Sequence, residues 1–228
     1  MELELKRGGR TARVETLGGE LVSYRDERGL EYIWGGDPAY WPGRNPLLFP
    51  IVGMLKEGKI RFDGREYAME RHGFARPLPF CLGAHTGFRC PLEAGERFED
   101  YELVFPERES CPTLLLRDGL LDRPAALPCL EDTDTLPLDY RWFDALDTLI
   151  FEGLRSRKSG RGVRVSFDGF PMLAFWTMPG KKAPYLCIEP WHGCAAGTAE
   201  GPEFTDKAHC IVLAPGESRT LAYRADTL

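Results

Sequence analysis

The chain contains 228 residues, of which 43% are hydrophobic and 11% aromatic. This composition excludes a disordered chain, and the length suits a single all-β domain. Acidic residues outnumber basic ones by 35 to 29, and a net charge of −6 is the wrong sign for a protein that binds nucleic acid through its phosphates. We therefore expect one folded domain, spanning residues 1–228, that does not bind nucleic acid.

The sequence contains no apolar run near the roughly 20 residues that a membrane-spanning helix needs. Its longest such run, residues 47–55, is interrupted by Pro50 and Gly53. The first residues alternate charge with leucine, unlike the apolar core of a signal peptide. We expect a cytoplasmic protein with no membrane partner, in which the seven scattered cysteines are reduced.

Short runs that alternate apolar and polar residues recur along the chain, and turn residues separate them. Residues 59–62 and 65–69 form the clearest pair, because Asp63-Gly64 between them is typical of a type I′ hairpin. The other predicted strands are residues 3–6, 11–15, 21–25, 32–34, 101–105, 148–154, 163–167, 173–176, 185–189, 209–213 and 220–224. The proline-rich residues 107–139 predict loops, and only residues 138–146 could form a short helix. The pattern predicts an all-β, mainly antiparallel sandwich or barrel.

Three of the four histidines lie in polar or glycine-rich surroundings, namely His72, His85 and His192. Histidine gains and loses a proton near neutral pH, so a histidine pair facing a carboxylate can work as an acid and a base without metal or cofactor. Glu189 is the carboxylate that the sequence favours. It ends an apolar run and precedes Pro190-Trp191, and apolar surroundings make a carboxylate a stronger base.

Two other interpretations of these residues stay open. Glu189 could cap a turn, with each histidine an ordinary hydrogen-bonded residue. A zinc site is the second alternative, although its candidate ligands lack the paired spacing of known zinc sites. Those ligands are Cys187, His192, Cys194, His209 and Cys210.

At these residues the sequence resembles the aldose 1-epimerase (galactose mutarotase-like) superfamily, in particular its short bacterial mutarotase-like branch. The resemblance rests on motifs that occur in family order: Tyr32-Ile33-Trp34-Gly35-Gly36-Asp37, Trp41, Asn45-Pro46-Leu47-Leu48-Phe49-Pro50-Ile51-Val52-Gly53, Asp63-Gly64, Arg71-His72-Gly73-Phe74-Ala75-Arg76, Pro79-Phe80-Cys81-Leu82-Gly83-Ala84-His85, Phe98-Glu99-Asp100-Tyr101, Ile188-Glu189-Pro190-Trp191-His192-Gly193 and Leu213-Ala214-Pro215-Gly216-Glu217-Ser218. Each motif alone is weak, whereas the ordered set is strong.

The resemblance implies an antiparallel β-sandwich of the galactose mutarotase-like (supersandwich) type, which binds an aldose and interconverts its anomers without a cofactor or metal. By resemblance, Glu189 would be the general base at the anomeric hydroxyl, His85 the general acid at the ring oxygen, and His72 a ligand of sugar hydroxyls. The expected substrate-binding residues are Arg71, Arg44, Trp191 and Asp147.

Two features depart from the family. Met54 stands where many members have a sugar-binding arginine, and His72 and His85 are only 13 residues apart, where the family inserts several strands. The resemblance therefore predicts a fold reduced in size by an internal deletion. The chain would then close around the gap or form a homodimer through an exposed strand edge.

A third consequence of the gap would be loss of turnover. That leaves a non-catalytic carbohydrate-binding protein on the same fold, with Trp41, Trp176 and Trp191 as apolar faces for a sugar ring.

Overall fold

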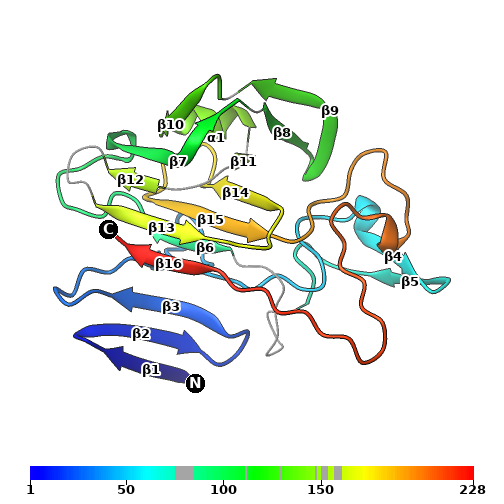
Figure 1. The fold of residues 1–228 in the computed structure, drawn as a ribbon, viewed down its shortest axis with the longest axis horizontal. Coiled ribbons are helices and arrows are strands. Elements are labelled where there is room, and N and C mark those ends of the chain that lie inside the picture. Colours follow the sequence, from blue (N-terminus) through cyan, green and yellow to red (C-terminus); the bar gives the residue numbers. More distant parts are fainter. Residues whose placement is uncertain (75–84, 111, 129, 147, 150–153, 157–160) are drawn as a thin grey trace.

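The computed structural model describes the chain except for residues 75–84, 111, 129, 147, 150–153 and 157–160 (Figure 1). Almost all of its regular structure is antiparallel strand, and the predicted all-β class is confirmed. None of the helices in the described part is both long and apolar enough to span a membrane.

Two larger sheets form the body of the molecule, and all of their paired strands are antiparallel. The first has the order β10 (Thr133–Pro137), β7 (Tyr101–Glu109), β12 (Leu154–Ser156), β13 (Gly162–Ser166) and β16 (Arg224–Thr227). The second has the order β11 (Thr148–Leu149), β14 (Met172–Trp176), β15 (Tyr185–Trp191) and β6 (Thr86–Arg89).

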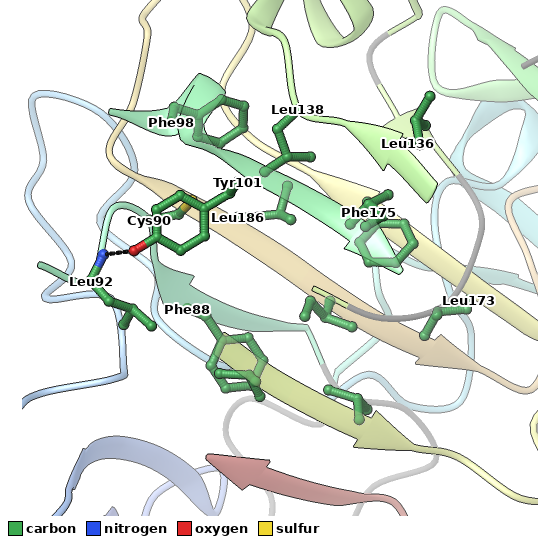
Figure 2. Close-up of a cluster of buried hydrophobic side chains, with 14 of the residues drawn as sticks. Phe88, Cys90, Leu92, Phe98, Tyr101, Leu136, Leu138, Leu173, Phe175 and Leu186 are labelled. Carbon is green, nitrogen blue, oxygen red and sulfur yellow. Dashed lines mark hydrogen bonds between the residues drawn. The ribbon is translucent and has the colours of Figure 1, made fainter. Parts of the chain in front are cut away.

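The main hydrophobic core lies between these two sheets (Figure 2). Phe175 of β14 and Leu186 and Ile188 of β15 are among the buried side chains that fill it. Successive residues of a strand point to opposite faces. Cys187 and Glu189, which alternate with Leu186 and Ile188 in β15, therefore lie on the other face of the second sheet. The core thereby fixes which face of that sheet carries the candidate site.

A three-stranded sheet of β1 (Glu2–Arg7), β2 (Arg10–Glu15) and β3 (Glu20–Arg25) begins the chain and lies beside β16 in Figure 1. Every residue of the edge strand β1 is exposed, including Leu3 and Leu5. An exposed edge strand of this kind offers unpaired backbone groups to another strand.

The hairpin predicted around Asp63-Gly64 is confirmed as β4 (Lys59–Phe62) and β5 (Arg65–Ala68). Asp63 and Gly64 have φ angles of 48° and 70°, and two positive φ values in a two-residue loop are the mark of a type I′ turn.

The prediction that residues 107–139 form loops is wrong. They include a second hairpin, β8 (Pro112–Arg117) with β9 (Leu120–Pro128), and strand β10. This hairpin tolerates three prolines. Pro112 and Pro128 are paired at the open end of the two-stranded ladder, and Pro124 lies in the irregular stretch of β9 between Asp122 and Ala126, so few backbone N–H groups are needed at these positions. The turn between the strands is again Asp-Gly, at residues 118 and 119, and both residues have positive φ angles. The Asp-Gly pair is the hairpin signal in this proline-rich segment.

The short helix predicted within residues 138–146 is confirmed as α1 (Tyr140–Leu146). Single turns of 3₁₀-helix occur at η1 (Lys56–Gly58), η2 (Phe98–Asp100) and η3 (Phe204–Asp206). Residues 209–213, a predicted strand, are not in a strand, and Val212 and Leu213 are exposed. The prediction is wrong there because apolar alternation forms a strand only where another strand is available to pair with it.

Candidate active site

The candidate site is built on the ladder of β14, β15 and β6 (Figure 1). In this ladder Ile188 pairs with Thr86, so continuing the antiparallel register by one step brings His85 beside Glu189. On its other side Glu189 pairs with Ala174 of β14. The sheet therefore aligns the predicted acid and the predicted base in one row.

His85 and Glu189 are in direct contact. Nε2 of His85 lies 3.2 Å from Oε1 of Glu189, and the two side chains are only 10% and 2% exposed. The indole Nε1 of Trp191 donates a hydrogen bond of 3.2 Å to Oε2 of the same carboxylate. Trp191 and Glu189 are two residues apart in β15, so they share a face, and the indole holds the carboxylate in its orientation toward His85.

The protonation of His85 is shifted by its surroundings. Burial lowers its pKa well below the ordinary value of 6.5, and the neighbouring charges of His72 and Arg71 lower it further. The imidazole is therefore neutral at pH 7. Its Nδ1 is buried and has no hydrogen-bond partner among the described residues.

His72 lies next to His85, and the two residues are 13 positions apart in the chain. The two rings meet edge to face with centroids 5.5 Å apart. Gly53 anchors His72 twice: its N–H donates to Nδ1 of His72 at 3.1 Å, and its carbonyl accepts the His72 N–H at 2.9 Å. The Phe49-to-Gly53 motif and the His72-Gly73 motif are thus joined directly.

Aromatic rings surround the pair on the outer side. Trp41 lies 4.9 Å and Trp176 5.6 Å from the His85 ring, centroid to centroid, and both indoles are only partly buried. Trp41 can lie close to the sheet because Gly87 has no side chain, and a Cβ there would come within 3.0 Å of the indole. Tyr185, which packs against Trp41 and Trp176, completes this wall.

The predicted substrate-binding residues have different surroundings. Arg71 reaches the site, since its charge acts on His85 and its Nη2 lies 3.0 Å from Sδ of Met54. Arg44 instead turns its guanidinium to the carbonyl of Gly35, at 3.1 Å. Trp191 contacts Glu189, as described above, whereas Asp147 lies outside the described residues.

The zinc site considered from the sequence does not form. Nδ1 of His192 contacts the backbone carbonyl of His209 at 2.8 Å instead of facing the cysteines. In the described part of the chain, one group of three potential metal ligands has its ligand atoms close together. This group consists of His85, Cys187 and Glu189. Sequence reasoning missed this combination, although alternation along β15 places Cys187 and Glu189 on one face. Cys187, like Cys90, Cys194 and Cys210, is a free thiol.

Comparison with known proteins defines the class to which this fold belongs. The structure matches a galactose mutarotase related enzyme from Lactobacillus acidophilus with a TM-score of 0.87 and 22% identity, covering 100% of this chain and 95% of that one. A galactose mutarotase-like protein from Lactobacillus casei matches with a TM-score of 0.87 and 21% identity over 100% of both chains. The fold is therefore the galactose mutarotase-like β-sandwich, as predicted.

In sequence the chain is 33% identical to protein LacX, plasmid, of Lactococcus lactis subsp. lactis, and the alignment covers 98% of each chain. The chain therefore belongs to the same family as protein LacX. No protein-family model matches it.

The comparison with LacX also bears on the predicted internal deletion. The alignment spans 294 positions, more than the 228 residues of this chain, and includes both ends of LacX. LacX therefore contains internal residues that have no counterpart here, and the prediction of a shortened chain is confirmed.

The packing of the His72 loop leads to a stability prediction. Gly73 has φ of 73°, and a Cβ there would lie 2.1 Å from the backbone oxygen of Phe49. Gly64, with φ of 70°, has open space around it. Gly64→Ala should cost only the left-handed penalty of about 1 kcal/mol. Gly73→Ala should reduce the free energy of unfolding by about 1–3 kcal/mol more. Urea unfolding measures both, and equal losses would contradict the close packing.

The low pKa of His85 leads to a pH prediction. NMR of the imidazole groups, with the His85 signals assigned from the His85→Gln spectrum, should show His85 still mostly neutral at pH 6.5. The unfolded chain binds a proton near pH 6.5 that folded His85 does not. His85 thus contributes stability that is present above this pH and is lost as the pH falls through the folded pKa. Half-protonation at pH 6.5 or above would contradict the prediction.

Proposed function

We propose that this protein interconverts the α and β anomers of an aldose by acid–base opening of the sugar ring. The observation that carries this proposal is the contact between the buried Glu189 carboxylate and the buried His85 imidazole, 3.2 Å apart on one sheet face. Membership of the LacX family and the galactose mutarotase-like fold support it. An aldohexose is the default substrate.

In the proposed reaction Glu189, ionised, removes the proton from the anomeric hydroxyl. His85 donates its N–H proton to the ring oxygen as the bond between that oxygen and C1 breaks, which leaves an open-chain aldehyde. Rotation about C1–C2 and the reverse steps close the ring as the other anomer. Because Oε1 of Glu189 and Nε2 of His85 are in contact, His85 can regain a proton from Glu189, and the imidazole need not carry a lasting charge.

The neutral state of His85 suits this role. A neutral imidazole can act as hydrogen-bond donor to a developing oxyanion when its environment disfavours the charged form. Burial has that effect here. Trp191 holds Oε2 of Glu189, so Oε1 is the oxygen that works with His85.

The neighbouring residues would bind the sugar. His72 uses Nδ1 to accept the Gly53 N–H, so Nε2 is the atom that would bind a sugar hydroxyl. Arg71 would supply the donor that Met54 cannot, since its guanidinium lies against the end of the Met54 side chain. The partly buried rings of Trp41 and Trp176 would face the apolar side of the sugar.

A second candidate function is carbohydrate binding without turnover. The near-complete burial of Glu189 favours it, because a sugar must displace or pass the aromatic wall before it reaches the carboxylate.

The decisive experiment is anomer exchange of glucose and galactose, followed by NMR at neutral pH. Glu189→Gln should slow the catalysed exchange by about 10²- to 10⁴-fold, as expected for loss of a general base. Glu66→Gln is the control, since Glu66 is an exposed residue paired with Lys59. Equal rates in wild type and Glu189→Gln would contradict the mechanism, and sugar binding without any exchange in the wild type would select the binding protein.

The role of Arg71 is tested by comparing Arg71→Met with Arg44→Met. Loss of a charged hydrogen bond of about 1.5–3 kcal/mol should raise KM for the sugar roughly 10- to 100-fold in Arg71→Met. Arg44→Met should leave KM almost unchanged, because that guanidinium is engaged with Gly35. An equal rise in both variants would show that the arginines act through general charge and not through a contact of Arg71.

A further inference from the structure

Three potential metal ligands converge on the site face of the sheet. One nitrogen of His85, Sγ of Cys187 and one carboxylate oxygen of Glu189 all lie within 4.8 Å of one another, and all three residues are buried. Cys187 packs among the same aromatic side chains that enclose His85. The cluster combines nitrogen, sulfur and oxygen ligands, which is the set that Zn²⁺ accepts.

The backbone holds these residues in place without any ligand. Cys187 and Glu189 are two residues apart in β15, and His85 immediately precedes β6, the strand paired with it. A tetrahedral zinc site with bonds of about 2.0–2.3 Å separates its ligand atoms by roughly 3.5 Å. Nε2 of His85 and Oε1 of Glu189 are already 3.2 Å apart. Side-chain rotations that move the ligand atoms by about 1 Å would therefore complete the three-ligand arrangement.

Charge and hydrogen bonding also suit a divalent cation. Burial and the charge of Glu189 raise the pKa of the Cys187 thiol well above its ordinary value, so a bound cation must displace the thiol proton to solvent. The resulting thiolate and the carboxylate together neutralise the two positive charges of the cation, and this offsets the cost of placing charge in a buried site. The Trp191 indole already holds one oxygen of the carboxylate, as outer-shell groups do in metal sites. Nε2 of His85, which lies 3.2 Å from Oε1 of Glu189, is the ring nitrogen that faces the cluster.

We propose that His85, Cys187 and Glu189 form a binding site for a borderline-soft divalent cation such as Zn²⁺, and that the bound cation blocks acid–base chemistry at this site. The cation uses lone pairs that Glu189 and His85 need for proton transfer. It is thus an inhibitor and not a cofactor. The binding part stands on the geometry alone, whereas the inhibitory part rests on the proposed function.

Cobalt(II) chloride, added to the chelator-treated full-length protein, tests the binding part without any sugar. Coordination by Cys187 should produce a thiolate-to-cobalt charge-transfer band in the near ultraviolet. Cys187→Ser should lose this band and bind Co²⁺ at least about 10-fold more weakly, judged by the 10- to 100-fold effect of losing even an outer-shell partner. Cys194→Ser is the matched control, because Cys194 is an equally buried free thiol that does not belong to the cluster.

The outcomes separate the two parts of the proposal. No charge-transfer band, or a band that Cys187→Ser retains, would overturn the metal site. If Cys187→Ser fails to fold, Glu189→Gln provides the second test, since it should weaken Co²⁺ binding while the thiol remains. In a protein that catalyses anomer exchange, Zn²⁺ should slow the reaction and a chelator should restore it. Unchanged exchange with cobalt bound at Cys187 would overturn inhibition alone, and absence of exchange in the metal-free wild type would count against the proposed function and not against metal binding.

Discussion

The pairing of β6 with β15 is the constraint on which the rest of the site depends. It places His85 beside Glu189, and the buried alternation of Leu186 and Ile188 fixes the face on which Glu189 lies. A slip of one residue would turn the carboxylate into the core between the sheets, where a charge is costly. The same hydrophobic packing that holds the two sheets together therefore also sets the geometry of the acid–base pair.

The described contacts around His72 join segments that are far apart in the chain. Gly53 binds His72, and the carbonyl of Met54 accepts the N–H of Ala196, which follows β15. A Cβ on Gly53 would lie only 2.5 Å from Cβ of Ala195, so this glycine allows the two segments to touch. These contacts and the edge-to-face packing of the two imidazole rings place His72 beside His85.

The sequence could predict features whose cause is local. Asp63-Gly64 specifies its hairpin through backbone conformation alone, and Glu189 attracts notice because it ends an apolar run. Features decided by tertiary pairing could not be predicted in this way. Residues 209–213 have a strand-like pattern but pair with no strand in the described part of the chain. Cys187 joins the site only because the pairing of β6 with β15 brings His85 close to it. The direction of the Arg44 side chain likewise depends on the Gly35 carbonyl, a contact that spacing does not reveal.

Burial of the site has two opposing effects on its chemistry. Excluding water strengthens the electrostatic contact between Glu189 and His85, because the local dielectric constant is low. The same burial keeps His85 neutral, and it encloses a carboxylate and a thiol that lie close together. Only a ligand that satisfies these groups is favoured in such a place. In the proposed function a sugar would do so with hydroxyl groups, whereas the proposed cation would do so with its charge. The aromatic wall of Trp41 and Trp176 would then favour the sugar, because a sugar ring has an apolar face.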